Sequence, residues 1–132
     1  ERDSAIFMFD VNNLKSTNDV WGHQEGDSLL FSIAQILSKL FEPEGKVFRI
    51  GGDEFAVILP LSKKPDPDLY QQKFLASVAL ANESRVHPIS IAYGYAISDK
   101  AEGISLRKAF HLADEAMYRN KNEQRHILRD HS

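Results

Sequence analysis

The stretch 47–59, which reads VFRIGGDEFAVIL, decides the fold of this chain. It contains two strand-like apolar runs, 47–50 and 55–59, joined by a short Gly-Gly-Asp-Glu turn at 51–54. Two such runs around a glycine-containing turn are typical of an antiparallel hairpin. The sequence therefore predicts a β-hairpin whose turn carries two adjacent acids.

Strand-like and helical patterns alternate on both sides of this hairpin. The run 5–9 is apolar throughout and ends at Asp10, as expected of a strand buried on both faces. Helical spacing predicts helices at 27–41, at 67–82 with Asp66 as N-cap, and from 106 to about 121, with a strand at 89–96 before the last helix. The resulting order, βαββαβα, predicts an α+β fold with a ferredoxin-like core and an added C-terminal helix.

This topology places Asp10 close to the hairpin turn. A right-handed crossover through the first helix makes the first two strands parallel, so the first strand and the strand before the turn end at the same sheet edge. We therefore expect Asp10 to lie beside the turn at 51–54, although more than forty positions separate them.

Composition excludes several classes of protein. A chain of 132 residues with 42% hydrophobic and 27% charged residues fits one globular domain spanning 1–132. Its apolar runs are too short to cross a bilayer, so we expect no membrane contact by this domain and a cytoplasmic location, whether or not the full-length protein is membrane-anchored. A net charge of −3 without a basic face argues against a nucleic-acid partner.

The converging acids Asp10, Asp53 and Glu54 predict a cation site. Carboxylates this close repel one another unless a cation lies among them, and Mg²⁺ prefers carboxylate, phosphate and water oxygens. The glycines at 51–52 would either let the backbone approach a ligand or adopt positive φ. The polar loop expected at 11–19 is typical of a ligand-binding loop. The alternative is that Asp10 merely ends a strand and that Gly-Gly-Asp merely makes a tight turn.

Several ordered segments carry a family resemblance: FDVNNLK at 9–15, ND at 18–19, GH at 22–23, GD at 26–27, RIGGDEF at 49–55 and ADEAMY at 113–118. In these segments the chain resembles the GGDEF family of diguanylate cyclases, over positions from about 5 to 125. The resemblance implies a nucleotide-cyclase fold. Since the family usually begins with a further helix, we expect a fragment of a longer multidomain signalling protein with attached regulatory domains.

The resemblance also implies roles for individual residues. Metal binding falls to Asp10, the Val11 carbonyl and Asp53, with Mg²⁺ or Mn²⁺ as the cofactor. Asn18 and Asp27 would recognise guanine, and Lys121 and Arg125 would bind the phosphates. Lys15 would neutralise charge in the transition state. Glu54 or Asp53 would remove the proton of the 3′-hydroxyl. For His23, substrate contact and a loop-orienting role remain equal alternatives.

The implied activity is condensation of two GTP molecules into cyclic di-GMP. Each 3′-hydroxyl attacks the α-phosphate of the other GTP, and two pyrophosphates leave. Because one domain of this family holds one GTP, catalysis would need a homodimer. Two alternatives remain: a weak or inactive domain that binds GTP as a regulatory module, and a purely structural dimerisation domain.

Some positions depart from the family pattern. Asn12 and Asn13 stand where a second Asp and an aromatic residue are frequent, and Gln124 and His126 replace the glycine and asparagine that commonly flank Arg125. The product-inhibition motif Arg-x-x-Asp corresponds here to Glu42 and Gly45, so we expect that feedback site to be absent.

Overall fold

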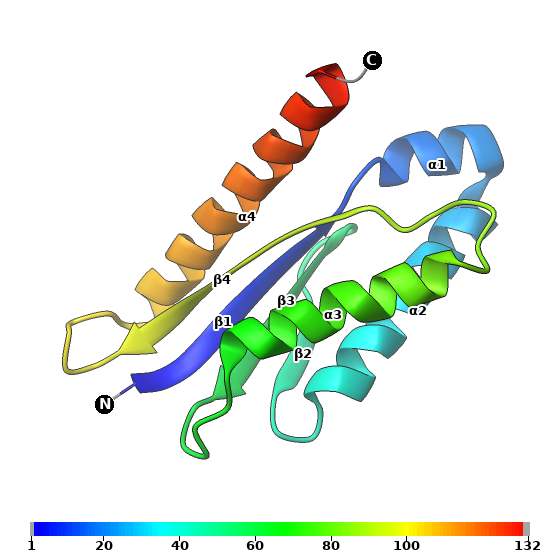
Figure 1. Cartoon of the computed structure of the whole chain (residues 1–132). Helices are drawn as coiled ribbons and strands as arrows, with labels where there is room; N and C mark the ends of the chain where they lie inside the picture. The colour runs from blue at the N-terminus through cyan, green and yellow to red at the C-terminus, as the bar shows by residue number, and fades with distance from the viewer. Residues whose placement is uncertain (1, 131–132) are drawn as a thin grey trace.

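The computed structural model describes residues 2–130 and contains one four-stranded sheet with helices on both faces (Figure 1). The elements follow in the order β1 (Arg2–Val11), α1 (Leu14–Trp21), α2 (His23–Phe41), β2 (Lys46–Arg49), β3 (Glu54–Pro60), α3 (Pro67–Asn82), β4 (Ile91–Asp99) and α4 (Leu106–Asp130). The sheet order is β2-β3-β1-β4, and each neighbouring pair is antiparallel. This confirms the predicted α+β fold, with β1 and β2 parallel to each other on either side of β3.

Strand β1 is the central element of the core. Its alternate residues Phe7 and Phe9 pack into the cluster beneath α2 and α3, whereas Ile6 and Met8 pack into the cluster beneath α4. Successive side chains of a strand point to opposite faces, so an apolar run is what a doubly covered strand requires. The same alternation places the side chain of Asp10, like those of Ile6 and Met8, on the α4 face of the sheet.

The two faces differ in how closely their helices approach. Aromatic rings fill the α2 and α3 side, where Phe9 and Phe74 have centroids 4.5 Å apart. On the other face α4 contacts β4 through small residues, and a Cβ added at Gly94 would lie 2.4 Å from the backbone nitrogen of Met117. Helix α4 is therefore held close to the β4 and β1 strands (Figure 1).

The prediction of a polar loop at 11–19 is wrong, because residues Leu14–Trp21 form helix α1. It spans only eight residues, most of them polar, so its sequence resembles a loop. It begins after Asn13, which has a left-handed φ of 60°, and ends at Gly22, where φ is 92°. Glycine adopts this conformation readily, so Gly22 separates α1 from α2.

Three other elements have bounds that differ from the predicted ones. Helix α2 begins at His23 rather than at 27, strand β4 covers Ile91–Asp99 rather than 89–96, and α4 continues nine residues beyond the expected end at about 121. The predicted cap is confirmed, since the Asp66 carboxylate accepts hydrogen bonds from the backbone N–H groups of Asp68 and Leu69. Within the described residues, none of the helices combines the length and apolarity needed to span a bilayer.

Candidate functional site

Three carboxylates meet where β1 ends and β3 begins. Asp10 and Glu54 are directly paired across the two strands, and Asp53 precedes Glu54 in the hairpin turn. One oxygen from each of Asp10, Asp53 and Glu54 lies within 4.8 Å of the others. We call these three residues the acidic cluster. The structure thus confirms the neighbourhood that the topology predicted.

Asp10 is the most buried member of the acidic cluster, at 6% exposed. Its Oδ2 accepts a 2.7 Å bond from Lys121 Nζ, while its Oδ1 is buried and has no hydrogen-bond partner among the described residues. A buried carboxylate oxygen without a partner is unfavourable unless a ligand satisfies it. The donor set, all carboxylate oxygens with one of them unpaired, fits a hard divalent cation such as Mg²⁺.

The electrostatics of the cluster act most strongly on Glu54. Burial, followed by the nearby charges of Asp10, Asp53 and Asp114, raises the pKa of the Glu54 carboxyl above its ordinary value, and Lys121 opposes this rise. The charged form is disfavoured because it combines desolvation with like-charge repulsion. A raised pKa is a property expected of a group that accepts a proton during a reaction.

Backbone and side-chain hydrogen bonds hold the hairpin turn in place. The Val11 N–H donates to the Asp53 carbonyl at 2.8 Å, which ties the turn to the end of β1. The Arg49 guanidinium donates to the carbonyls of Gly52 at 2.8 Å and Gly51 at 3.3 Å. Sequence reasoning gave Arg49 no role, because a single arginine on a strand usually indicates only a solvated charge.

The two turn glycines do not adopt the left-handed conformation that was one of their expected functions. Neither has positive φ, and among the described residues a Cβ added at Gly51 or Gly52 would meet no atom within 4 Å beyond its chain neighbours. Their lack of side chains instead leaves open space beside Asp53. This space is consistent with the other expected function, close approach of a ligand to the backbone.

The residues expected to recognise guanine, Asn18 and Asp27, come from neighbouring helices. Asn18 lies on α1 and packs against the buried Gly26 of α2, so closely that a Cβ there would lie 1.8 Å from Asn18 Oδ1. That oxygen is buried and has no hydrogen-bond partner. Asp27 is exposed on the next position of α2. The structure thus brings Asn18 close to the residue before Asp27.

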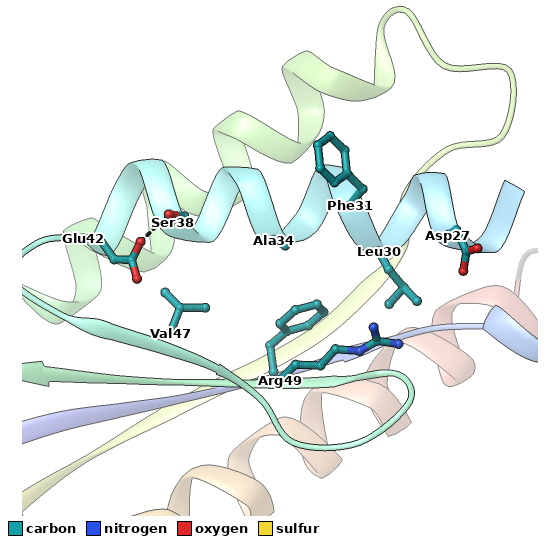
Figure 2. Close-up of a pocket in the computed structure, with 9 residues that line it drawn as sticks. Asp27, Leu30, Phe31, Ala34, Ser38, Glu42, Val47 and Arg49 are labelled. Atoms are coloured by element: carbon teal, nitrogen blue, oxygen red, sulfur yellow. Dashed lines mark hydrogen bonds between the residues drawn. The ribbon is translucent and has the colours of Figure 1, made fainter. Parts of the chain in front are cut away.

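A groove of about 540 Å³ runs between α2 and the β2–β3 hairpin. Figure 2 shows Asp27 and Leu30 on α2 with Arg49 below them at one end, and Glu42 with Val47 at the other. The groove is apolar along its middle and carries charges at both ends. Its Asp27 end is therefore suited to a planar base with polar edges.

A smaller cavity of about 150 Å³ lies on the other side of the β1 end. It is lined by Asn12, Asn13, Ser90, Lys121, Gln124 and Arg125. The structure thus brings together the two cations expected to bind phosphate, Lys121 and Arg125. Lys15, in the first turn of α1, and His23, at the start of α2, are both exposed and belong to neither lining.

The position of the expected feedback motif carries no arginine. Glu42 is exposed just after α2 and accepts a hydrogen bond from the Ser38 hydroxyl, while Gly45 is buried near the backbone of Phe41. A carboxylate and a buried glycine offer no cationic group to a phosphodiester. The absence of this feedback site stays a prediction.

Comparison with known proteins decides the family. The family model described as "Diguanylate cyclase, GGDEF domain" matches residues 1–126. The chain belongs to the GGDEF family. Among its relatives, diguanylate cyclase DgcM of Escherichia coli K12 is 30% identical over 124 residues, which cover 94% of this chain and 30% of DgcM.

Solved structures agree with the fold of this GGDEF domain. The isolated GGDEF domain of TpbB (YfiN) from Pseudomonas aeruginosa matches with a TM-score of 0.77 and 31% identity, covering 92% of this chain and 73% of that one. The GGDEF domain of DgcB from Caulobacter crescentus, solved in complex with c-di-GMP, matches with a TM-score of 0.79 and 24% identity over 92% and 74% of the two chains. The second likeness concerns the fold alone.

This GGDEF domain spans about 30% of the length of the curated relative DgcM. The remainder of DgcM lies outside the match. The acidic cluster, the groove and the small cavity are the features of this domain from which a function can be argued.

Proposed function

We propose that this domain is a magnesium-dependent diguanylate cyclase that condenses two GTP molecules into cyclic di-GMP. The observation that carries the proposal is the acidic cluster, with the buried and unpaired Oδ1 of Asp10 at its centre. Asp10, Asp53 and the Val11 carbonyl would hold the metal. When bound, Mg²⁺ supplies charge neutralisation at the α-phosphate and its leaving group.

The chain's own residues would position the substrate around this cluster. Asp27 accepts from the N1 and N2 hydrogens of guanine, and Asn18 pairs with the remaining polar edge, so adenine would leave both groups unpaired. Lys121 and Arg125, which line one cavity, would bind the phosphates, and Lys15 would neutralise charge that develops in the transition state.

A residue of the hairpin turn would remove the proton of the attacking 3′-hydroxyl. Glu54 has a raised pKa, which favours it over Asp53 as the group that takes the proton of the attacking 3′-hydroxyl. The oxygen then forms a bond to the α-phosphorus of the other GTP, and the bond to pyrophosphate breaks. Two such steps close the ring, and a homodimer with two-fold symmetry would bring the two GTP molecules face to face.

A second function is a GTP-binding regulatory module without turnover. The observation that favours it is that Asn12 and Gln124, two departures from the family pattern, line the same cavity as the proposed phosphate-binding cations Lys121 and Arg125. In that case the domain would bind GTP with Mg²⁺ and release no product.

The test is incubation of the concentrated domain with GTP and Mg²⁺, followed by chromatography of the products. Cyclic di-GMP that is lost in Asp53→Ala and Glu54→Ala supports the cyclase. Magnesium-dependent GTP binding without product, in this domain and in a longer chain, supports the regulatory module. A domain that binds no nucleotide contradicts both.

A further inference from the structure

We propose that Asn12 and Gln124 are positioning residues, whose side chains form an amide clasp that sets where the cations of α4 stand relative to the acidic cluster. This inference rests on the proposed cyclase site, because it concerns the groups that would bind its phosphates. Asn12 Nδ2 donates to Gln124 Oε1 at 2.8 Å, although the two residues are 112 positions apart. The clasp therefore joins the loop after β1 directly to the last helix.

Both amides are engaged beyond this bond. Asn12 Nδ2 also donates to Ser90 Oγ at 3.0 Å, and the Asn12 backbone N–H donates to the Ser90 carbonyl at 2.8 Å. Gln124 Nε2 donates to the Ile91 carbonyl at 3.0 Å and to Asn120 Oδ1 at 3.2 Å. Gln124 thus links the end of β1, the start of β4 and its own helix.

The clasp lies beside both groups of charges that the reaction would use. Asn12 is two residues after Asp10, the buried member of the acidic cluster. Gln124 is three residues after Lys121 and one before Arg125, and all three line the same small cavity. Residues at i and i+3 of a helix lie on one face. The Gln124 contact therefore controls how far the Lys121 side chain reaches toward the acidic cluster and how the helix is rotated about its axis at that point.

Besides the clasp, the Tyr93 backbone N–H of β4 donates to Asn120 Oδ1 of α4 at 3.0 Å, and the same oxygen accepts from Gln124 Nε2, so this bond belongs to the same network. Helix α4 packs on the sheet through Ala109, Ala113 and the close approach at Gly94. Apolar burial is non-directional, whereas hydrogen bonds depend on distance and angle. The Lys121–Asp10 ion pair uses an oxygen of the acidic cluster itself. The clasp uses no cluster oxygen, so it can hold α4 whether or not a cation occupies the cluster.

The clasp also explains two departures from the family pattern together. Asn12 and Gln124 are both changed, and each supplies the partner that the other requires. Because both side chains are neutral, they connect the helix to the loop without adding charge beside Lys121 and Arg125. An aspartate at 12 would face Gln124 Oε1 with another acceptor.

A double-mutant cycle tests the clasp: Asn12→Ala, Gln124→Ala and the double variant, each compared with wild type. The matched control is Ser98→Ala, because the buried Ser98 hydroxyl bonds to the backbone of Ser4 at the opposite end of the β1–β4 pair. Two quantities are measured: amide hydrogen exchange of residues 118–127 without nucleotide, and the affinity for a non-hydrolysable GTP analogue with Mg²⁺.

Both single variants should exchange faster in 118–127 and bind the analogue about fivefold more weakly, the factor expected of one hydrogen bond. The double variant should bind no more weakly than either single variant, since both remove the same contact. Ser98→Ala should leave the affinity and the exchange of 118–127 unchanged.

The failures of the two proposals are distinguishable. A wild-type protein that binds no GTP overturns the proposed function, and with it this role for the clasp. A wild type that binds GTP, while the variants leave affinity and exchange unchanged or lose affinity additively, overturns the clasp alone. Equal loss of affinity in Ser98→Ala would reduce Asn12 and Gln124 to general stabilisers and would also overturn it.

Discussion

Lys121 Nζ lies 2.7 Å from Asp10 Oδ2, which joins the last helix to the end of the first strand across 111 positions of sequence. Asp10 is buried, whereas the Lys121 side chain is 29% exposed. The lysine therefore neutralises a carboxylate that is almost entirely buried. The same carboxylate belongs to the acidic cluster, so Lys121 and a divalent cation would act on one group.

Replacing Lys121 should destabilise the protein when no divalent cation is present. In Lys121→Met the buried Asp10 carboxylate loses its only described side-chain partner, and we expect a loss of about 1–3 kcal/mol in the free energy of unfolding. Urea titration in the presence of a chelator measures this. Added Mg²⁺ should stabilise the variant more than wild type, because a bound cation restores the missing charge.

Lys108→Met is the control for that change, since Lys108 is exposed near the start of α4. It should behave like wild type in both titrations. Equal unfolding midpoints for Lys121→Met and Lys108→Met would show that the ion pair contributes nothing to stability.

The raised pKa of Glu54 predicts how stability depends on pH. A carboxyl group whose folded pKa is raised holds its proton more tightly in the folded state, so its contribution to stability falls as pH rises from the unfolded pKa through the folded one. Glu54→Gln should therefore be more stable than wild type at pH 7 without divalent cations, by roughly 0.5 kcal/mol because the site is solvent-screened. Thermal unfolding from pH 4 to 8 measures the difference, which should vanish toward pH 4.

Mg²⁺ provides the internal control for this pH effect. Saturating Mg²⁺ should reduce the advantage of Glu54→Gln at pH 7, because a cation in the cluster relieves the repulsion. A constant difference at every pH, with or without Mg²⁺, would attribute the stabilisation to something other than the charge of Glu54.

Arg49 should be required for an ordered hairpin turn. Arg49→Lys keeps the charge but cannot form the fork that bonds the carbonyls of Gly51 and Gly52. We expect Mn²⁺ affinity, measured by electron paramagnetic resonance, to fall roughly threefold to tenfold, as the loss of about one charged hydrogen bond implies. Lys46→Ala, at an exposed position of the same strand, should leave it unchanged.

Gly26 should control base selectivity without controlling stability. In Gly26→Ala the new Cβ would lie 1.8 Å from Asn18 Oδ1 and displace that side chain. Because the displaced atom ends a side chain and alanine favours helix by about 1 kcal/mol, the free energy of unfolding should be unchanged or slightly raised. The preference for a GTP analogue over an ATP analogue should fall, as in Asn18→Ala. Gln35→Ala, at an exposed position of α2, should retain it.

Much of the fold follows from local pattern. The apolar run of β1, the hairpin around Gly51 and Gly52, and the Asp66 cap are all confirmed, because each depends on residues adjacent in sequence or on a fixed periodicity. Helix α1 was missed because its eight residues are mostly polar, and so short a segment cannot be told from a polar loop by its pattern.

The sequence by itself determined the acidic cluster, because the helical crossover makes β1 and β2 run in the same direction, which places Asp10 and the hairpin turn at the same sheet edge. Only the tertiary structure decided how that cluster is supported. The Lys121–Asp10 pair and the Asn12–Gln124 clasp form only once α4 has packed on the sheet, where it approaches β4 closely at Gly94. Contacts of this kind join residues more than a hundred positions apart and have no local pattern, since their distance and angle arise only when the helix has packed.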